Sequence, residues 1–323
     1  MTNIVITSVD ADYLPRMMAL YQSLRQHWSK VQLVVYCFDD LTFQVLSDLK
    51  LAQLTPIAFS DFISERHQKA LANMSFIYEL YWSYKPHILQ ETLRRYPKAQ
   101  NIIYLDSDIM LLSDPAETLL PSTGHDILLQ TNNFSAQEMD EFLPIGYYCA
   151  GFMSIRRSPT ATLALEWWNE RCLEWCLART EDGKFADQKY LDDWRTRFPG
   201  VEEITAIGAG VAPWNVQKYD VSEKNMLPQV NNQPVIYYHY HSFAMNYRTF
   251  EHRVTGERKN FYTLSADAVK VFYAPYVAAL KDAVQILTTI PEYKLYIQNY
   301  PEGQSKSLHA ETKYYSFRKS LSE

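Results

Sequence analysis

The chain has 323 residues, of which 47% are hydrophobic, and it carries a formal net charge of −6 at pH 7. A chain of this length and composition is globular and forms one large α/β domain or two ordinary domains. The acidic balance argues against nucleic acid as a partner, because domains that bind nucleic acid normally present a basic surface.

The N-terminal segment and the hydropathy pattern contain no targeting or membrane-spanning signal. The first ten residues, MTNIVITSVD, lack the basic start and the long apolar stretch of a signal peptide. No run of about 18 apolar residues occurs. The nearest candidate, 271–287, is interrupted by Lys281 and Asp282. These features predict a cytoplasmic protein.

The four cysteines, Cys37, Cys149, Cys172 and Cys176, are too few for a disulfide framework in a chain of this length. Cys172 and Cys176 are four residues apart in an expected helix and could bind one metal ion together. Because no second ligand pair lies nearby, buried free thiols are the better interpretation.

The first 130 residues alternate strand-like and helix-like segments. Residues 3–8 and 31–38 are β-branched and apolar, as in strands that are covered on both faces. Pro86 is best placed at a helix start, where its missing N–H is harmless. The alternation predicts a mostly parallel sheet with helices on both sides. Further elements are expected at 14–24 (helix), 41–50 (helix), 54–59 (strand), 76–96 (helix) and 101–106 (strand).

Beyond residue 125 the alternation loosens. From about residue 260 the sequence predicts helix, followed by a segment rich in tyrosine and lysine. No repeat or linker is present, so we interpret the chain as one continuous domain with a helical tail. The expected elements are strands at 126–131, 147–156 and 234–243, a long helix at 158–178 and a further helix at 185–198.

Two acidic residues end the strand at 101–106, in the stretch NIIYLDSDIMLLSD. Asp106 and Asp108 are two positions apart, so in extended chain they share a face and can converge on one ligand. Two like charges held so close repel unless a cation or protons lie between them. The alternative is a polar strand end at which Asp108 or Asp114 caps the next element.

Polar residues also follow the other expected strands, which favours a ligand site, because ligands of parallel sheets bind beyond the carboxyl ends of the strands. No G-x-G-x-x-G motif follows the first strand and no P-loop motif is present, which disfavours an ordinary dinucleotide site and a P-loop NTPase. The polar residues at strand ends are Thr7, Ser8, Asp10, Asp39, Asp40, Asp106, Ser107 and Asp108.

His239 and His241 are also two positions apart, in the strand expected at 234–243. If this strand approaches Asp106 and Asp108, the carboxylates and imidazoles suit Mn²⁺ or Mg²⁺ with positions left open for substrate oxygens. A zinc site would use more histidine or cysteine. The alternative is that both histidines are ordinary polar residues of a strand face.

Three further positions are candidates for contact with a phosphate or a hydroxyl-rich ligand. Lys85 precedes Pro86 at an expected helix start, where the helix dipole favours an anion, and Arg248 follows the histidine strand. For both cations the alternative is an ordinary surface position. Asp187 and Gln188 begin an expected helix, where the acid could simply cap the helix or could hold hydroxyl groups together with the amide.

Taken together, these motifs resemble the GT-A-fold glycosyltransferases, in particular the glycogenin/galactosyltransferase-like family and related nucleotide-diphospho-sugar transferases. The resemblance covers residues 3–245 by order and spacing of motifs. YLDSDIML matches the Asp-x-Asp motif that binds a divalent metal and the donor diphosphate in that family. Lys85 in SYKPHILQ matches its basic helix residue, Asp187-Gln188 matches its Asp-Gln, and His239 in VIYYHYHSF aligns with its metal-binding histidine.

Other positions depart from the family pattern. YYCAGFMSI is similar to the family's small-residue strand, with Cys149 in place of an asparagine, and PWNVQ is similar to its aromatic-Asn element at Trp214 and Asn215. His241 is an additional residue that could share or replace the role of His239. The family's Lys-Pro-Trp after the histidine is absent, and the residues there are Met245, Asn246 and Tyr247.

The resemblance implies a GT-A-type α/β fold with a Rossmann-like, mostly parallel central sheet flanked by helices. It implies a glycosyltransferase domain at 1–255, with a nucleotide-sugar-binding half at 1–125 and an acceptor half at 126–255. A helical C-terminal extension would occupy 256–323. The implied activity is metal-dependent transfer of a hexose-like sugar from a nucleotide diphosphate to a saccharide or glycolipid hydroxyl, in polysaccharide biosynthesis.

Two other functions compete with this one. A non-catalytic nucleotide- or sugar-binding subunit on the same fold would tolerate loss of Asp108 or Asp187, and both are present. A phosphohydrolase with an Asp-x-Asp nucleophile would carry threonine or valine at the position of Met110, and its motif would follow the first strand. The sequence therefore favours the transferase.

The resemblance also implies a role for each candidate residue. Asp187, with Gln188, would lie beside the reacting sugar, as a general base in an inverting enzyme or as a stabiliser of positive charge in a retaining one. Mn²⁺ or Mg²⁺ would be bound by Asp106, Asp108, His239 and His241; the nucleoside by Thr7, Ser8 and Asp10; and the diphosphate by Ser107, Lys85 and Arg248.

The acceptor is expected to be a saccharide or a lipid-linked glycan. The helix at 158–178 contains three tryptophans, Trp167, Trp168 and Trp175, for which core packing is a better interpretation than stacking on sugar rings. The tail ETKYYSFRKSLSE mixes basic and aromatic residues and could touch a membrane surface that carries the acceptor. An untethered C-terminus is the simpler interpretation.

Overall fold

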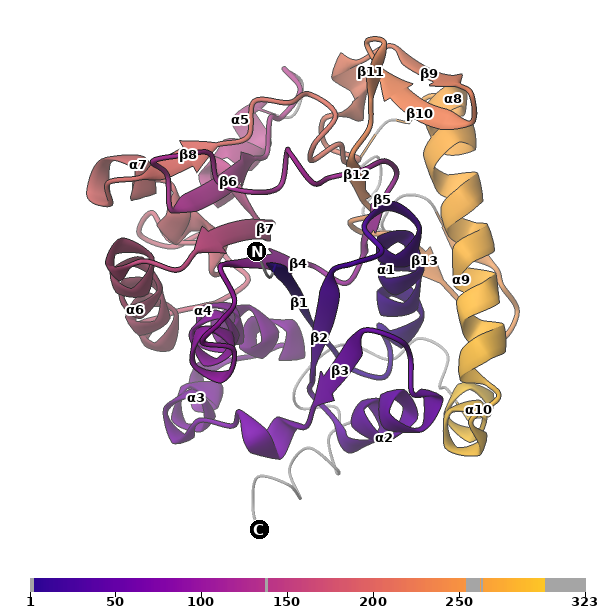
Figure 1. Cartoon of the computed structure of the whole chain (residues 1–323), viewed down its shortest axis with the longest axis horizontal. Helices are drawn as coiled ribbons and strands as arrows, with labels where there is room; N and C mark the ends of the chain where they lie inside the picture. Colours follow the sequence, from indigo (N-terminus) through magenta and orange to yellow (C-terminus); the bar gives the residue numbers. More distant parts are fainter. Residues whose placement is uncertain (1–2, 137–138, 254–261, 263, 300–323) are drawn as a thin grey trace.

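The computed structural model describes residues 3–136, 139–253, 262 and 264–299, and its centre is a seven-stranded sheet in the order β3-β2-β1-β4-β7-β6-β8 (Figure 1). The first four strands in this order are parallel, β7 is antiparallel to both of its neighbours, and β8 is parallel to β6. This confirms the α/β fold with a mostly parallel sheet. The strands are β1 (Asn3–Val9), β2 (Gln32–Cys37), β3 (Leu54–Ile57), β4 (Asn101–Leu105), β6 (Ile127–Thr131), β7 (Tyr148–Arg156) and β8 (Val201–Glu203).

The central strands are apolar on both faces. In β1, Ile4 and Ile6 belong to the core on one side of the sheet, whereas Val5 and Val9 belong to the core on the other. Successive side chains of a strand point to opposite faces, so a strand that is covered on both sides reads as a continuous apolar run. This is why the two N-terminal strands are visible in the sequence.

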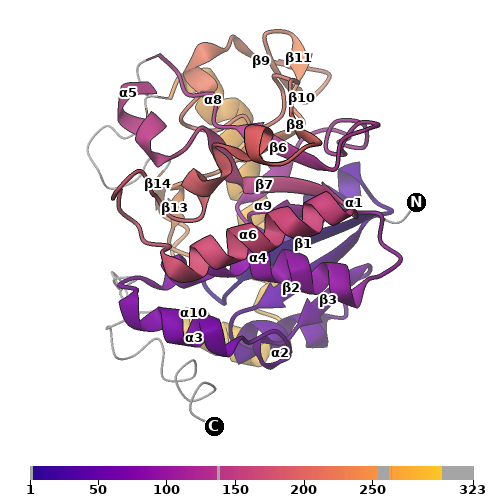
Figure 2. The ribbon, with the colours of Figure 1, turned by 90° about the vertical axis from the view of Figure 1, so that its left-hand side faces the viewer.

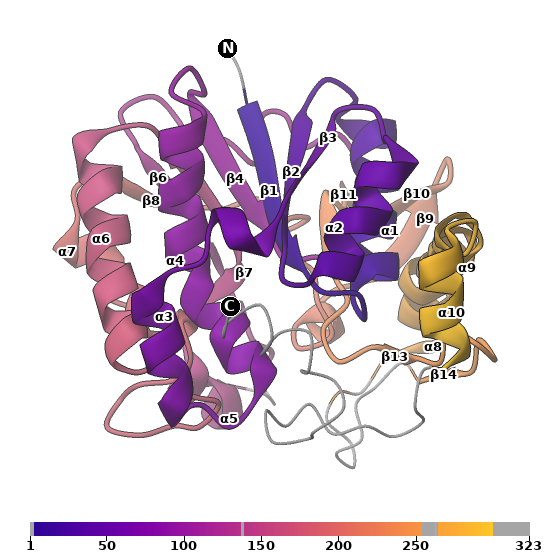
Figure 3. The same cartoon turned by 90° about the horizontal axis from the view of Figure 1, so that it is seen from below.

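Helices cover both faces of the sheet (Figures 2 and 3). In Figure 2, α6 and α4 lie side by side in front of the strands. Figure 3 shows the same pair on one side of β4 and β1, with α1 and α2 on the other. One face is covered by α3 (Glu65–Ala70), α4 (Ile77–Arg95) and α6 (Pro159–Glu174), and the other by α1 (Leu14–His27), α2 (Asp40–Leu49), α9 (Ala274–Leu287) and α10 (Pro291–Gln298).

The prediction that Pro86 begins a helix is wrong. Pro86 lies inside α4, which continues without interruption from Ile77 to Arg95. Proline removes one helical hydrogen bond and disfavours helical backbone at the preceding residue. Here burial of the apolar face of α4 against the sheet outweighs both costs. That face includes Leu80, Tyr84, Ile88 and Leu89.

The tryptophans of the helix expected at 158–178 pack in the core or at its margin, which is the interpretation that the sequence favours. Trp168 is fully buried and packs edge-on against Trp194, with ring centroids 5.7 Å apart. Trp167 and Trp175 pack at the margin of the same core. The helix itself, α6, ends at Glu174, earlier than expected.

The part of the chain after residue 125 contains shorter elements than the sequence predicts. The strand expected at 234–243 is present only as β12 (Tyr237–His239), which pairs antiparallel with β5 (Ile109–Leu111). The chain turns directly after this pair: Tyr240 N–H donates to Asp108 O, the last bond between the two segments, and Tyr240 O accepts from Phe243 N–H. The helix expected at 185–198 is replaced by a 3₁₀ turn, η4 (Gln188–Leu191), and α7 (Trp194–Arg197).

The remaining short elements lie between the larger ones along the chain. Figure 1 places the sheet β9-β10-β11 beside α8, at one end of the long C-terminal helical run. The remaining short elements are α5 (Met139–Phe142), β9 (Val221–Lys224), β10 (Leu227–Val230), β11 (Gln233–Pro234), β13 (Ala244–Met245), β14 (His252–Arg253), and the turns η1 (Phe59–Asp61), η2 (Leu71–Asn73), η3 (Leu143–Ile145) and η5 (Val216–Lys218).

The helices expected after residue 260 are present in the described residues. α8 (Ala266–Ala268), the π-helical turn η6 (Val269–Tyr273) and α9 form one run that packs on α1 (Figure 1). In the described part of the chain no helix combines the length and apolarity needed to cross a bilayer. The tail at 311–323, with its expected membrane contact, lies outside the described residues, as does the boundary expected at residues 255 and 256.

The four cysteines are all buried and free, as the sequence predicts. Cys172 and Cys176 contact each other inside the core. Their surroundings are apolar, and neither residue belongs to the metal-binding group found among the described residues.

Candidate metal and donor site

Asp106 and Asp108 lie in a tight turn between β4 and β5. Asp106 N–H donates to Gly151 O at 2.8 Å, which extends the pairing of β4 with β7 by one residue. Ile109 N–H then donates to Asp106 O at 3.1 Å and closes the turn, and Tyr240 N–H donates to Asp108 O at 2.9 Å. Backbone hydrogen bonds on both sides therefore fix the two carboxylates where a central strand ends.

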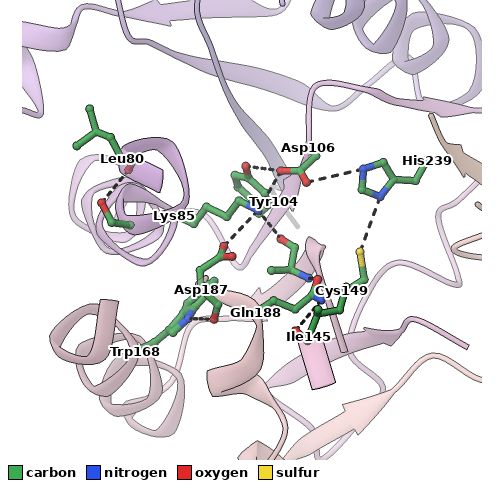
Figure 4. A network of polar contacts seen from close by, with 12 residues as sticks. Leu80, Lys85, Tyr104, Asp106, Ile145, Cys149, Trp168, Asp187, Gln188 and His239 are labelled. Carbon is green, nitrogen blue, oxygen red and sulfur yellow. Dashed lines mark hydrogen bonds and ion pairs between the residues drawn. The ribbon is translucent and has the colours of Figure 1, made fainter. Parts of the chain in front are cut away.

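His239 brings an imidazole to these carboxylates. Its Nε2 lies 3.1 Å from Asp108 Oδ1. The same atom lies 3.9 Å from Asp106 Oδ2, as Figure 4 shows. One ligand atom from each of the three residues lies within 4.8 Å of the other two. The pairing of β12 with β5 explains this approach, because it places His239 opposite Ile109, directly after Asp108.

Protonated His239 and ionised Asp108 stabilise each other. Burial would lower the pKa of His239, but Asp108 raises it well above the ordinary value. Burial would likewise raise the pKa of Asp108, but His239, Arg16 and His241 together lower it. A divalent cation bound here would replace the positive charge of the imidazole proton. Metal binding would therefore be coupled to deprotonation of His239.

Gly151 leaves room for this group. A Cβ atom at this position would lie 2.7 Å from His239 Cε1 and 2.8 Å from Asp106 Oδ2, which is too close for either contact. The strand β7 therefore needs glycine opposite the Asp-x-Asp turn. In the sequence, Ala-Gly is visible only as part of a family-like strand, and nothing there indicates this role.

Lys85 connects this group to a third carboxylate. Its Nζ lies 3.2 Å from Asp106 Oδ1, 3.3 Å from Asp187 Oδ2 and 3.2 Å from Ala150 O (Figure 4). The expectation that Lys85 lies at a helix start is wrong, because the residue is in the middle of α4 and buried. Burial would lower the pKa of its amine, but Asp106 and Asp187 raise it well above the ordinary value, so the amine is charged.

Tyr104 orients Asp106, a role that the sequence analysis missed. Its hydroxyl donates to Asp106 Oδ1 at 2.7 Å, and its ring lies beneath the Lys85 ammonium group, 5.3 Å from the ring centroid. Ser8, on the neighbouring strand β1, lies close to the Tyr104 hydroxyl. Tyr104 precedes Asp106 by two residues on the same strand face, and this spacing could have indicated the contact.

Asp187 and Gln188 lie beside Lys85 on the opposite side from the Asp-x-Asp turn. Asp187 is only 2% exposed, and its carboxylate contacts Lys85 and does not cap a helix. Burial raises the pKa of Asp187 and Lys85 opposes this shift. Gln188 accepts from Ala150 N–H at 3.1 Å and donates to Ile145 O at 3.2 Å, so it holds β7 in place (Figure 4).

The residues expected around the nucleoside lie at the end of β1. Thr7 is fully buried, and Ser8 joins the Tyr104 network. Asp10 accepts from Tyr81 OH at 2.9 Å, and Asp39 accepts from Ala11 N–H at 2.8 Å, so this loop is fixed from two sides. Ser107, also buried, lies in the Asp-x-Asp turn.

His241 and Arg248 lie farther from the centre. His241 is exposed; its ring centroid lies 6.1 Å from that of His239, and it is not part of the metal-binding group found among the described residues. Arg248 is exposed, with Nη1 3.5 Å from Gln298 O of α10. Two other residues do contact His239: the Trp214 ring lies edge-on at 5.3 Å, and Cys149 Sγ lies 3.8 Å from Nδ1.

This arrangement can be compared with known proteins. The family model of the nucleotide-diphospho-sugar transferases matches residues 29–197, which include α4, the Asp-x-Asp turn, β7 and Asp187. The chain belongs to this family. It is therefore a glycosyltransferase of the nucleotide-diphospho-sugar transferase family, with a candidate metal site at Asp106, Asp108 and His239.

Two relatives of this glycosyltransferase come from Bacillus subtilis, and both are uncharacterized proteins. YfnF is 30% identical over 252 residues, which cover 76% of this chain and 83% of YfnF. YfnD is 26% identical over 294 residues, which cover 89% of this chain and 92% of YfnD. The similarity therefore extends well beyond the segment that the family model matches.

Solved structures support the GT-A fold. The galactosyltransferase LgtC, determined with donor and acceptor sugar analogues, aligns with a TM-score of 0.54 at 14% identity over 91% of this chain and 99% of LgtC. The glycosyltransferase GlyE of Streptococcus pneumoniae aligns with a TM-score of 0.52 at 13% identity, over 91% of this chain and 64% of GlyE. At these identities the likeness shows the fold.

The side chains of Asp106, Asp108 and His239 fit a GT-A divalent-metal site. Two carboxylates and one imidazole are available, and Gly151 keeps the space between them free of a side chain. Oxygen-rich sets with one histidine suit hard or borderline cations that keep open positions for phosphate oxygens. The candidate site is thus consistent with the chemistry of the family to which the transferase belongs.

Proposed function

We propose that the enzyme binds Mn²⁺ or Mg²⁺ through Asp106, Asp108 and His239 and uses it to hold the diphosphate of a nucleotide sugar. The sugar is then transferred to a hydroxyl of a saccharide or lipid-linked glycan. The observation that carries this proposal is the convergence of three ligand atoms within 4.8 Å at the end of β4. His241, close enough to influence Asp108, is a further candidate ligand.

When bound, the metal ion neutralises charge on the leaving diphosphate, which helps the glycosidic bond to break. Lys85 holds Asp106 and Asp187 in fixed positions, because its ammonium group contacts both carboxylates and is almost fully buried. A preorganised charge of this kind needs no rearrangement during the reaction. This buried lysine thus couples donor binding to Asp187, the group beside the reacting sugar.

Asp187 acts through its charge in this proposal. Its carboxylate is nearly inaccessible and paired with Lys85, so it is poorly placed to accept a proton from an acceptor hydroxyl. A fixed carboxylate stabilises positive charge that develops on the sugar as the bond to the diphosphate breaks. Gln188 accepts from Ala150 N–H and so fixes the position of β7 beside Asp187.

The nucleoside lies at the end of β1 in this proposal, beside Thr7, Ser8 and Asp10. The loop there is fixed by Tyr81 and Asp39, which supports a preformed pocket wall. Ser107 presents its backbone to the diphosphate, and Arg248 would reach it only after leaving its contact with α10. The free, buried cysteines fit a reducing, cytoplasmic location.

The proposal is tested by incubating the protein with UDP-, GDP- and dTDP-sugars and measuring release of the nucleoside diphosphate, with Mn²⁺ and with EDTA. Many transferases hydrolyse their donor slowly when acceptor is missing, so no acceptor needs to be known. Release from one donor class that stops with EDTA is the expected result. Equal release with EDTA, or none from any donor, would contradict the proposal.

A further inference from the structure

Arg16, on the first turn of α1, is a buried cation whose acidic neighbour Asp108 lies beyond ion-pair distance. Its side chain belongs to the buried residues, at 9% exposure, and no ion pair joins it to a carboxylate anywhere in the described ranges. Arginine keeps its charge when it is buried, because its pKa lies far above neutrality. A buried charge is costly unless an opposite charge lies beside it. An anion from outside the chain would therefore stabilise this position.

The guanidinium group is held in one orientation but retains unused donors. Its Nη2 donates to Phe243 O at 2.6 Å, and its Cζ lies 4.2 Å above the ring of Tyr13. Nε has no hydrogen-bond partner, and Nη1 donates to none of the described residues and, unlike Nε, is not enclosed. The group is thus anchored at one nitrogen and free to donate from another.

Arg16 lies beside the candidate metal group. It is close enough to Asp108 to favour the ionised carboxylate, and Phe243, its hydrogen-bond acceptor, follows His239 by four residues. The segment 243–247 reads FAMNY and contains no lysine or arginine. The next residue, Arg248, is exposed and lies against Gln298 of α10, so on this side of Asp108 the buried cation comes from α1.

We propose that Arg16 is a donor-binding residue that contacts the diphosphate of the nucleotide sugar from the α1 side, opposite Lys85. Its planar, multiply donating group suits the non-bridging oxygens of a phosphate. This inference rests on the proposed function, because it assigns a contact to the same donor. It goes beyond that function by adding a residue that no sequence motif indicates.

The test is calorimetric titration of inorganic pyrophosphate with Mg²⁺ into the wild type and the variants Arg16→Gln and Arg16→Lys. Loss of charge-assisted hydrogen bonds should weaken pyrophosphate binding about 10- to 100-fold in Arg16→Gln, with a smaller loss in Arg16→Lys. Binding of Mg²⁺ alone should stay within about threefold, since Arg16 is not a metal ligand and acts on the ion only through its charge. Arg25→Gln is the matched control, because Arg25 is on the same helix and donates to Ser29 O and Val31 O.

The outcomes separate this inference from the proposed function. Unchanged pyrophosphate affinity in Arg16→Gln would overturn the inference and leave the proposed function standing, as would an equal loss of affinity for Mg²⁺ alone. A wild type that binds neither pyrophosphate nor any nucleoside diphosphate with metal would overturn the proposed function, and the inference with it.

A second measurement keeps the inference testable if Arg16→Gln does not fold. In wild-type protein labelled with ¹⁵N-arginine, the Nε–H resonance of Arg16 is assigned by its disappearance in Arg16→Lys. Addition of pyrophosphate with Mg²⁺ should shift this resonance, whereas Mg²⁺ alone should leave it in place. A resonance that does not move while pyrophosphate binds would contradict the assignment.

Discussion

The Nζ atom of Lys85 lies 3.3 Å from Oδ2 of Asp187, and both side chains are almost completely buried. Lys85 comes from α4 and Asp187 from the loop before η4, so this ion pair connects two elements on the same side of the sheet. Asp106, the third member, belongs to the candidate metal group. A change at Lys85 should therefore affect both stability and donor binding.

Lys85→Met should lower the free energy of unfolding by about 3–5 kcal/mol, because it leaves the Asp187 carboxylate buried without its cation. Urea unfolding followed by tryptophan fluorescence measures this loss. Lys189→Met is the control, since Lys189 pairs with Asp192 in a partly exposed position and should cost less than about 1 kcal/mol. Equal losses in the two variants would contradict the account of the buried pair.

Asp187→Asn should separate donor binding from transfer. We expect affinity for the nucleoside diphosphate with Mn²⁺ to be nearly unchanged, whereas turnover of the donor sugar should fall by about 10²–10³-fold, as when other charge-stabilising groups are removed. Binding is measured by calorimetry and turnover by release of the nucleoside diphosphate. Asp193→Asn, at an exposed pair with Arg197, serves as the control. Full turnover in Asp187→Asn would show that Asp187 has no catalytic role.

Tyr104→Phe should weaken metal binding by about tenfold, because it removes the hydroxyl that orients Asp106. The measurement is Mn²⁺ titration followed by electron paramagnetic resonance. Tyr36→Phe removes a similar buried hydroxyl, bonded to Thr92 Oγ1 at 2.7 Å, on strand β2 of the same sheet. That control should lose about 1 kcal/mol of stability but keep the metal affinity of the wild type. A loss of metal affinity in both variants would point to a general effect of buried hydroxyl groups.

Gly151→Ala should abolish metal binding in a protein that still folds. The added methyl group would lie within 3 Å of His239 and Asp106 and would push these side chains apart. Ser154→Ala, on the same strand, removes a buried hydroxyl that has no partner in the described part of the chain and should leave metal binding intact. Wild-type metal affinity in Gly151→Ala would contradict the claim that His239 and Asp106 need the space left by Gly151.

Asp39 should make the stability of the protein depend on pH. Burial, together with Asp10, raises the pKa of Asp39 from 3.8 to about 6. The folded state therefore binds an extra proton between about pH 4 and 6, and its stability falls as pH rises through this range, by about 3 kcal/mol. Asp39→Asn should lose one hydrogen bond at every pH but should remove this component of the pH dependence.

Urea unfolding at pH 4, 5, 6 and 7 compares the wild type with Asp39→Asn. The difference in unfolding free energy between the two proteins should shift in favour of the variant as pH rises. A difference that stays constant across the series would mean that Asp39 titrates at its ordinary pKa in the folded protein.

The sequence predicts the carboxylate turn well because its signal is local. Asp106 and Asp108 follow an apolar strand, and two-residue spacing and strand ends are visible in a single chain. The sequence predicts His239 as a ligand from its residue type and its place in the order of motifs. It also predicts that the strand continues through His241. Pairing of β12 with β5 stops at His239, and this depends on contacts between segments far apart in the chain.

The network around the carboxylates could not be predicted in the same way. Because proline breaks most helices, Pro86 predicts a helix start at Lys85, yet packing against the core keeps α4 continuous. The contacts of Lys85 with Asp187 and of Arg16 with Phe243 join residues 102 and 227 positions apart, a separation at which spacing carries no information. Only the packing of α4 and α1 against the sheet shows which cations face the site.

The measurement that tests the central claim most directly is calorimetric titration of UDP, GDP and TDP into the protein, with Mn²⁺ and with EDTA, in the wild type and in Asp108→Asn. Asp114→Asn, which changes an exposed acid in the same segment, is the control. We predict that one nucleotide binds tightly to the wild type and to the control only with Mn²⁺, and that Asp108→Asn loses this binding while remaining folded. Equal binding with EDTA, or unchanged binding in Asp108→Asn, would contradict the claim that Asp106, Asp108 and His239 hold the metal that binds the donor.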